Sequence, residues 1–480
     1  MYYLNYIGGQ WTESVSKTFL NNINPHNQEV LDHFPSSTVE DMKQAILAAH
    51  LAFSFWSKLS YQERGHYLLK AAEILSQKVE EIGRDLTLEE GKTLGEAIGE
   101  TKRAVSVLKY FAGEATQSIG EVIPSANAET MIYTKRVPVG PIGLITPWNF
   151  PIAIPAWKIA PALVYGNTVV IKPSEFTPKS VYHLIKAFDD AGIPPGVLNC
   201  VFGSGADIGA ELVANQLIHA ISFTGSNKVG NIIKQNSAVK GKKVQLEMGG
   251  KNPLIVLNDA NIEKAVAFTI QDGFMSTGQK CTAASRIIVE EGIYEEFREQ
   301  LLEKTMALQV GNPLAKGTFM GPIVSATQLE VVLSMIEEGK KEAKLLFGGG
   351  RIEKSELSNG FYVEPTIFEV ASQDAQITRK EIFGPVITLI KVSSFEEAIK
   401  LANDTEYGLS AAIFTTNLTI AQQFIDQAEA GMVHINSGTV GTEFQAPFGG
   451  TKMSSDGPRE QGKTAIDFYT KIKTVYLDRA

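Results

Sequence analysis

The chain has 480 residues, of which 20% are charged and 44% are hydrophobic, and its formal net charge is −9. This length exceeds what one hydrophobic core usually serves and predicts two or three domains. The acidic balance without clustered basic residues argues against a nucleic-acid partner. The seven histidines have no metal-ligand spacing, so we expect no bound metal.

The N-terminus and the cysteines indicate a compartment. The first residues lack the basic n-region and the apolar h-region of a secretory signal. Two cysteines make no disulfide framework, which is typical of a reducing environment. We therefore expect a cytoplasmic protein. Residues 137–171 are apolar but contain six prolines, so we expect strands, turns and a short helix there rather than a membrane span.

Periodicity predicts an α/β fold. From residue 40 to about 112, apolar residues recur three and four positions apart, as in helices that cover a sheet. Beyond residue 140, β-branched runs alternate with helical segments, which predicts βαβ units and parallel sheets. The predicted strands are 142–146, 168–172, 197–202 and 219–224, then 253–257, 286–290 and 411–415 in a second series, with helices at 294–307 and 395–403.

Two further segments have local signatures. Residues 120–138 and the tail from about 462 show an extended, amphipathic pattern. The run Gly348-Gly349-Gly350 predicts a surface turn. A phosphate loop is the weaker interpretation, because no helix start with Lys-Ser or Lys-Thr follows it.

Cys281 is a candidate nucleophile. It follows Gly278-Gln279-Lys280, whereas Cys200 lies among apolar residues as a buried thiol does. A thiolate near neutral pH needs an electropositive neighbour or a helix end, and Lys280 offers that charge. Taken alone, one cysteine leaves catalysis and packing equally open.

Two glycine turns after predicted strands are candidates for binding a dinucleotide phosphate. Gly225-Ser226-Asn227-Lys228-Val229-Gly230 opens a helical stretch, and Gly203-Ser204-Gly205 is followed by Gly209, one position late for the dinucleotide fingerprint. On glycines alone, an ordinary strand-to-helix turn explains each equally well. Lys172 and Glu175 follow a predicted strand, either as ligand contacts at the sheet edge or as a solvated surface pair.

A series of motifs across nearly the whole chain resembles the aldehyde dehydrogenase superfamily. In chain order the motifs are Thr146-Pro147-Trp148-Asn149-Phe150-Pro151, Lys172-Pro173-Ser174-Glu175, Phe223-Thr224-Gly225-Ser226, Leu246-Glu247-Met248-Gly249-Gly250-Lys251, Gly278-Gln279-Lys280-Cys281, Glu381-Ile382-Phe383-Gly384-Pro385 and Pro447-Phe448-Gly449-Gly450. Their shared order makes the resemblance more specific than any single motif.

The resemblance implies a fold and an assembly. A Rossmann-type dinucleotide-binding domain would comprise residues 1–119 and 139–248, and a second α/β catalytic domain residues 249–453. Residues 120–138 and 462–480 would form a small β oligomerisation segment. The implied assembly is a homo-oligomer, either a dimer or a tetramer, with no membrane or nucleic-acid partner.

The resemblance also implies a nicotinamide dinucleotide as cofactor. A carboxylate at Glu175 would repel a 2'-phosphate, so we expect NAD to be preferred, with NADP as the alternative because Lys172 offsets part of that charge. The implied contacts are Ile145, Thr146, Pro147, Trp148, Lys172, Ser174, Glu175, Gly205, Gly225, Ser226, Val229, Met248, Gly249, Glu381 and Phe383.

The implied chemistry is oxidation of an aldehyde to a carboxylic acid. Cys281 would attack the carbonyl to form a thiohemiacetal, while Asn149 and the Cys281 N–H hold the oxyanion. Hydride transfer would leave a thioester, which water activated by Glu247 would hydrolyse. Without the family, Asn149 is equally a turn former and Glu247 a salt-bridged carboxylate. Glu247 favours hydrolysis, because relatives that transfer the acyl group to coenzyme A lack a glutamate there.

The C-terminal motif is the best indication of the substrate. Ser454-Ser455-Asp456-Gly457-Pro458-Arg459-Glu460-Gln461-Gly462 resembles the α-ketoglutaric semialdehyde (2,5-dioxopentanoate) dehydrogenases. Succinate-semialdehyde dehydrogenase is one alternative, although its relatives often carry an arginine where this chain has Trp157. A broad-specificity aliphatic or aromatic aldehyde dehydrogenase is another. A catalytically silent structural relative is the most remote, given Cys281, Glu247 and Asn149.

Two groups of side chains are candidate substrate contacts. Arg103 and Lys280 are candidates for the carboxylate of a keto acid, since a buried charge needs a partner. An aromatic funnel for the aldehyde is expected from Phe150, Trp157, Phe274, Phe444 and Phe448.

Overall fold

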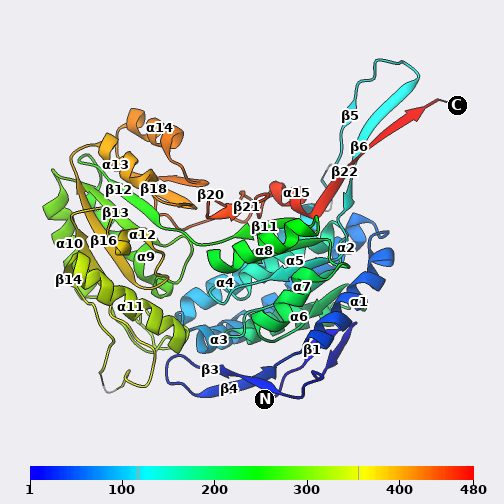
Figure 1. Cartoon of the computed structure of the whole chain (residues 1–480), viewed down its shortest axis with the longest axis horizontal. Helices are drawn as coiled ribbons and strands as arrows, with labels where there is room; N and C mark the ends of the chain where they lie inside the picture. The colour runs from blue at the N-terminus through cyan, green and yellow to red at the C-terminus, as the bar shows by residue number, and fades with distance from the viewer. Residues whose placement is uncertain (115, 118, 355, 480) are drawn as a thin grey trace.

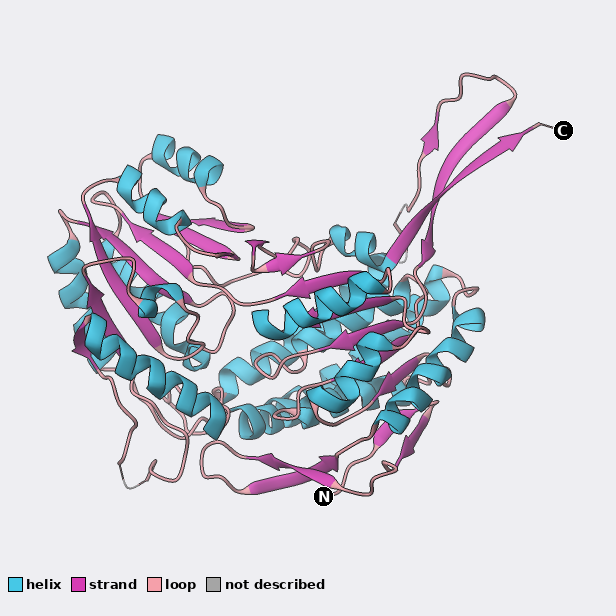
Figure 2. Cartoon of the chain, in the orientation of Figure 1, coloured by secondary structure: helices cyan, strands magenta, loops and turns pink. Residues whose placement is uncertain are grey.

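The computed structural model describes residues 1–480 except 115, 118, 355 and 480. Two large sheets, each covered by helices, lie side by side, and a narrow β arm projects from one of them (Figures 1 and 2). The predicted α/β class with two sheets is confirmed.

The first sheet has the strand order β2-β1-β9-β8-β7-β10-β11-β21. Its parallel centre consists of β9 (Leu198–Cys200), β8 (Val169–Lys172), β7 (Ile142–Ile145), β10 (Ala220–Thr224) and β11 (Lys243–Glu247). The chain proceeds outward from β7 to β9 on one side and from β10 to β11 on the other. The boundary between β7 and β10 is therefore the topological switch point, where open α/β sheets bind ligands.

Helices bury both faces of this sheet. The four helices before β7 confirm the helical prediction for residues 40–112, and α5 is buried along its whole length. The helices are α1 (Val39–Trp56), α2 (Tyr61–Gln77), α3 (Val79–Glu90), α4 (Leu94–Glu114), α5 (Ala153–Val164), α6 (Pro178–Asp190), α7 (Ala210–Ala214), α8 (Asn227–Val239) and α15 (Ile466–Tyr469).

The N-terminal strands were not predicted. They are β1 (Asn5–Ile7), β2 (Gln10–Thr12), β3 (Phe19–Ile23) and β4 (Val30–Pro35). β1 pairs antiparallel with β9 and so extends the first sheet, while β3 and β4 form a separate hairpin. Strands of three residues are too short for a period-2 pattern to stand out in sequence.

The second sheet has the strand order β14-β15-β16-β13-β12-β18-β19 and is parallel except for β14. Its strands are β14 (Lys344–Phe347), β15 (Thr366–Val370), β16 (Val386–Val392), β13 (Ala284–Glu290), β12 (Asn252–Val256), β18 (Ser410–Phe414) and β19 (Met432–Ile435). Its helices are α9 (Ile262–Phe274), α10 (Tyr294–Met306), α11 (Ala326–Glu342), α12 (Gln376–Arg379), α13 (Phe395–Asn403) and α14 (Leu418–Gln427).

All seven predicted strands are present in the two sheets, with ends shifted by at most two residues. The predicted helices at 294–307 and 395–403 are α10 and α13. The run 348–350 is the predicted turn after β14, with φ of +70° at Gly348 and +96° at Gly349.

The C-terminal segment returns from the second sheet to the first. β20 (Thr451–Lys452) pairs with β17 (Tyr407–Gly408), and β21 (Ser455–Asp456) then pairs antiparallel with β11, placing Ser455 opposite Glu247. This pairing brings the C-terminal motif next to the end of a central strand of the first sheet.

The projecting arm is a three-stranded sheet. β22 (Thr470–Asp478) pairs along its full length with β6 (Thr130–Pro138), and β5 (Val122–Ile123) lines the other edge of β6. Figure 1 shows the arm standing away from the body of the chain. The extended character predicted for 120–138 is confirmed. For the tail it is confirmed only from Thr470, because Lys463–Ala465 and Ile466–Tyr469 are helical.

No helix in the described part of the chain is long and apolar enough to cross a membrane. The apolar stretch 137–171 instead forms the end of β6, then β7, α5 and most of β8.

Candidate active site

Three neighbouring strand ends bring the predicted residues together. β7 leads into residues 146–149, β10 into Gly225 and Ser226, and β11 into Met248 and Gly249. The carboxyl ends of parallel strands lie at one edge of a sheet, so these segments meet at the switch point. Ser226 also caps α8, accepting a hydrogen bond from the Val229 N–H.

A cavity of about 250 Å³ lies at this edge, and we call it the strand-end cavity. Its lining consists of Pro147, Trp148, Asn149, Ile154, Thr224, Gly225, Ser226, Met248, Gly249, Cys281, Gln328, Val331, Glu381, Ile382 and Phe383. The sequence analysis missed Ile154, Gln328 and Val331. Gln328 and Val331 lie on α11, where no motif marks them, and only the fold brings that helix here.

The other predicted dinucleotide contacts lie outside this lining. Lys172 Nζ forms an ion pair with Glu175 Oε2 at 3.0 Å, and a Cβ added to Gly205 would lie 3.7 Å from the same ammonium. Thr146 N–H donates to the Lys172 carbonyl, so the two strand ends are joined. Ile145 precedes Thr146 and Ser174 precedes Glu175, while Val229 is exposed on α8.

Glu381 closes the strand-end cavity against Gly249 and Gly250. Its Oε1 accepts a hydrogen bond from the Gly250 N–H at 2.9 Å. A Cβ on Gly249 would lie 2.1 Å from Glu381 Oε2, so only glycine allows this approach. Burial raises the pKa of Glu381 to about 7.

A larger cavity of about 500 Å³ lies beside α4, and we call it the helix-side cavity. Its lining consists of Glu96, Gly99, Glu100, Lys102, Arg103, Ser106, Phe150, Gln271, Asp272, Met275, Ser276, Lys280, Val440, Thr442, Glu443 and Phe444. Asn149 and Cys281 line the strand-end cavity, while their chain neighbours Phe150 and Lys280 line the helix-side cavity. The Asn149–Cys281 pair therefore lies between two cavities.

The charges around Cys281 differ from the prediction. Desolvation raises the pKa of the Cys281 thiol, and the carboxylates of Glu381 and Glu247 raise it further. The expectation that Lys280 lowers this pKa is wrong, because its Nζ donates to the Gln271 carbonyl at 3.1 Å and its side chain lines the other cavity. Cys200 is fully buried, as predicted.

A left-handed turn precedes Cys281. Ser276, Thr277 and Gly278 have φ of +51°, +56° and +66°. A β-branched residue rarely adopts this conformation. Thr277 Oγ1 donates to the Gly321 carbonyl at 3.1 Å and Ser276 Oγ to Glu96 Oε1 at 2.8 Å, and these bonds hold the turn.

Asn149 is buried, and hydrogen bonds hold both its side-chain amide and its backbone carbonyl. Its side-chain Nδ2 donates to the Gln279 carbonyl at 2.9 Å, two residues before Cys281, and its own carbonyl accepts from Lys92 Nζ at 2.6 Å. A carboxamide has two N–H donors, and among the described residues only the Gln279 carbonyl accepts from this one. One N–H is thus free for a substrate oxygen.

Glu247 is buried at the end of β11. Its Oε2 accepts a hydrogen bond from Ser455 Oγ at 2.5 Å, and a Cβ on Gly449 would lie 2.6 Å from its Oε1. Burial raises the pKa of Glu247 well above its usual value, and the nearby Glu460 adds to this rise. The C-terminal motif thus contacts this carboxylate through Ser455, which the sequence analysis did not identify as a site residue.

The aromatic funnel is only partly present. Phe150 and Phe444 line the helix-side cavity. Trp157 is buried because its Nε1 donates to Glu460 Oε2 at 2.8 Å, and Phe448 packs against its ring. Phe274 is fully buried in the core of the second sheet. The funnel prediction is therefore wrong for Trp157, Phe448 and Phe274, which their partners hold away from the cavity.

Arg103 and Lys280 both line the helix-side cavity, but the Arg103 guanidinium and the Lys280 ammonium have different hydrogen-bond partners. Arg103 donates to the Thr442 carbonyl and hydroxyl and, at 3.2 Å, to Gln461 Oε1. Lys280 Nζ donates to the Gln271 carbonyl alone among the described residues. Burial lowers the pKa of Lys280, although Asp272 and Glu96 oppose this.

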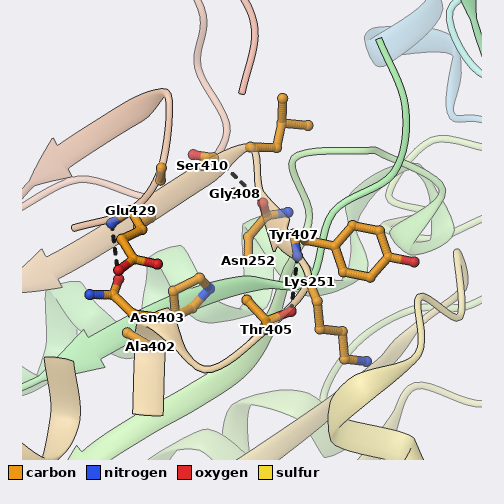
Figure 3. A pocket seen from close by; sticks show the side chains of 13 residues that line it. Lys251, Asn252, Ala402, Asn403, Thr405, Tyr407, Gly408, Ser410 and Glu429 are labelled. Carbon is orange, nitrogen blue, oxygen red and sulfur yellow. Dashed lines mark hydrogen bonds between the residues drawn. The ribbon is translucent and has the colours of Figure 1, made fainter. Parts of the chain in front are cut away.

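Another pocket, at the start of β12, is too small for a ligand. Figure 3 shows Asn252 directed at Ser410, and Asn403 at Glu429, with Lys251 extending away from these groups. Its volume of about 10 Å³ admits one water molecule at most. Predicted site residues instead line the strand-end and helix-side cavities.

Comparisons with known proteins agree with this geometry. The model of the aldehyde dehydrogenase family matches residues 11–475. The chain is 50% identical over 477 residues to alpha-ketoglutaric semialdehyde dehydrogenase of Bacillus subtilis (strain 168), covering 99% of this chain and 98% of that protein. It is 43% identical to alpha-ketoglutarate semialdehyde dehydrogenase of Haloferax volcanii, covering 98% of each. Betaine aldehyde dehydrogenase from Staphylococcus aureus, solved in complex with NAD+, superposes with a TM-score of 0.97 at 36% identity, covering 99% of this chain and 95% of that one.

Proposed function

Because the chain belongs to the aldehyde dehydrogenase family and oxidises an aldehyde with NAD or NADP, we propose that its substrate is α-ketoglutaric semialdehyde and its preferred cofactor NAD. The observation that carries this proposal is the position of Cys281 between two cavities, one lined by the dinucleotide motifs and the other by Arg103 and Lys280. The names of the Bacillus subtilis and Haloferax volcanii relatives support the choice of aldehyde.

The strand-end cavity fits the nicotinamide end of a dinucleotide. Gly225 and Gly249 line it, and the Ser226-capped start of α8 presents N–H groups for phosphate. Lys172 and Glu175 would contact the adenosine ribose, where the Glu175 carboxylate disfavours a 2'-phosphate. When bound, NAD supplies the hydride acceptor that converts a thiohemiacetal on Cys281 into a thioester.

Attack by Cys281 requires loss of the thiol proton, because its surroundings favour the neutral thiol. The thiol proton leaves to solvent water as the sulfur adds to the aldehyde carbon. The free N–H of Asn149 and the backbone N–H of Cys281 then stabilise the oxyanion.

Release of the acid is assigned to Glu247. Water adds to the thioester carbonyl while the Glu247 carboxylate takes its proton, and the C–S bond breaks to return the thiol and the carboxylic acid. Ser455 and Gly449 fix the carboxylate for this step. The hydrogen bond from Ser455 offsets part of the pKa rise that burial causes.

Lys280 is the best partner for the substrate carboxylate. Its ammonium has three donors and one protein acceptor, so donors are left for a carboxylate in the helix-side cavity. The Arg103 guanidinium gives three of its five N–H groups to Thr442 and Gln461, so it is held more firmly than the Lys280 ammonium and fixes the segment that carries Thr442. Phe150 and Phe444 supply apolar walls for the carbon chain.

A substrate panel tests this proposal. Purified enzyme with NAD is assayed by NADH formation against α-ketoglutaric semialdehyde, succinic semialdehyde and a neutral aldehyde of similar length. We expect the highest kcat/KM for α-ketoglutaric semialdehyde. A preference for the neutral aldehyde would contradict the substrate assignment, and inactivity towards the whole panel would favour a silent relative.

We also propose that the arm mediates a homo-oligomer and that the protein is cytoplasmic. Val122, Met131, Ile472 and Tyr476 on the arm are exposed, which is costly for a free monomer. Ile472→Glu should therefore lower the mass seen by analytical ultracentrifugation, and an unchanged mass would exclude the arm as the interface. The two free cysteines suit the cytoplasm, which cell fractionation can test.

A further inference from the structure

A buried lysine holds the backbone of the Asn149 segment. Lys92 lies in the short link between α3 and α4 and is only 1% exposed. Its Nζ donates to the Asn149 carbonyl at 2.6 Å and to Glu100 Oε2 at 2.7 Å, and it lies 4.2 Å from the centre of the Phe150 ring. An ammonium so enclosed is retained only where its donors are paired.

Glu100, on α4, holds the other end of the same segment. While its Oε2 pairs with Lys92, its Oε1 accepts from the N–H groups of Ile152 at 3.0 Å and Ala153 at 3.1 Å. These N–H groups are at the start of α5, where a carboxylate satisfies unpaired donors and interacts favourably with the helix dipole. The Lys92–Glu100 pair therefore spans residues 149–153 from both sides.

The connection continues towards the nucleophile. The Asn149 side chain donates to the Gln279 carbonyl at 2.9 Å, and Gln279 Oε1 accepts from the Val324 N–H. Lys92 thus joins α3 and α4, through Asn149, to the segment that presents Cys281. No other described side chain bonds to the Asn149 carbonyl.

The charge of Lys92 is maintained inside the protein. Burial opposes the charge, but the carboxylates of Glu100 and Glu90 outweigh it, so the pKa of Lys92 lies above its usual value. The Glu90 Oε2 lies 4.0 Å from the Lys92 Nζ, whereas the Glu100 Oε2 lies 2.7 Å from it. Lys92 and Glu100 are consequently the ion pair that matters, and they form one unit.

We propose that Lys92 and Glu100 are positioning residues of the oxyanion site, which set the side-chain amide of Asn149 where the oxygen of the attacked aldehyde develops its charge. This inference rests on the proposed role of Asn149 and extends it to two residues outside every motif of the sequence. Catalytic geometry is sensitive to displacements of about 1 Å, which cost roughly a hundredfold in rate.

The test removes the pair together. Removing one partner would leave a buried unpaired charge, so the variant is Lys92→Met with Glu100→Gln. The rate of the first NADH turnover reports acylation, and NAD titration and thermal melting are measured alongside. We expect acylation to slow by about 10- to 100-fold while the affinity for NAD is unchanged.

Arg64→Met is the matched control. Arg64 is also a buried cation, and its Nε donates at 2.8 Å to the carbonyl of Val164, at the opposite end of α5. We expect this variant to lose thermal stability as the pair variant does, but to keep the wild-type acylation rate. Equal slowing by Arg64→Met would overturn the proposal in favour of general destabilisation of α5.

A double-mutant cycle with Asn149→Ala tests whether Lys92 and Glu100 affect acylation through Asn149. If the pair acts through Asn149, adding its two substitutions to Asn149→Ala should slow acylation little further. Full additivity would overturn the inference and leave the role of Asn149 intact. If Asn149→Ala itself acylates at the wild-type rate, the proposed oxyanion role is wrong, and the inference falls with it.

Discussion

The two cavities beside Cys281 are built in different ways. The strand-end cavity forms where β7, β10 and β11 end, and its lining includes Gly225, Gly249 and the Ser226 cap of α8. The helix-side cavity is made from side chains of α4, the turn before Cys281 and residues 440–444. We therefore expect sheet topology to determine cofactor binding and individual side chains to determine which aldehyde is accepted.

The largest effect should come from Cys281, which lies between the two cavities. We expect Cys281→Ala to reduce activity by at least about a thousandfold, because no other group can form the thioester. NAD affinity should persist, since the strand-end cavity is otherwise intact; calorimetry measures it. Cys200→Ala is the control and should keep most activity. Turnover remaining in Cys281→Ala would refute the mechanism.

Glu247→Gln should separate the two halves of the reaction. We expect a burst of about one NADH per active site and then turnover slowed by about 100-fold or more, since only water activation is lost. In the wild type, a raised pKa means that the carboxylate is protonated up to a higher pH. Thioester hydrolysis should therefore be lost as pH falls through that pKa. Uniform slowing without a burst would move Glu247 to the first step.

Lys280→Met tests the helix-side cavity alone. We expect KM for α-ketoglutaric semialdehyde to rise about tenfold or more, with little change for a neutral aldehyde, because a charge-assisted hydrogen bond is lost. Because the Lys280 ammonium loses its charge as pH rises through its lowered pKa, the affinity for the substrate carboxylate should fall over that pH range. Arg103→Met is the comparison. An equal KM increase for both aldehydes would deny Lys280 this role.

Glu175→Ser tests the strand-end side far from the chemistry, and its effect should be the smallest. The Glu175 side chain is partly exposed, so water screens its charge. We expect the ratio of kcat/KM for NAD over NADP to fall about fivefold. Steady-state kinetics with both cofactors measures it. Equal wild-type efficiencies would already disprove the electrostatic argument.

The sequence predicted the strand-end cavity far better than the helix-side cavity. Gly225, Gly249 and Glu381 belong to short motifs placed by strand ends, and local sequence encodes such placement. The direction of a long side chain depends on partners remote in sequence. Trp157 turns towards Glu460 and away from the cavity, and Lys280 turns towards Gln271 rather than towards the Cys281 thiol.

The fold shows the same limit. Long periodic helices and apolar parallel strands were located to within two residues, because their patterns repeat. β1 has three residues and pairs with the distant β9, and the local hairpin of β3 and β4 was missed as well. Lys92 was missed for a related reason: a single lysine between two helices has no signal until the fold places Asn149 above it.

The left-handed turn at Ser276 and Thr277 has a consequence for protein engineering. Such conformations cost about 1 to 3 kcal/mol each, and the surrounding bonds must maintain them. Laboratory selection for heat tolerance would favour substitutions that relax this turn, since a relaxed turn would raise the melting temperature. The same change would loosen the segment that carries the nucleophile. A screen that scores survival after heating, without scoring turnover, would therefore enrich durable but impaired catalysts.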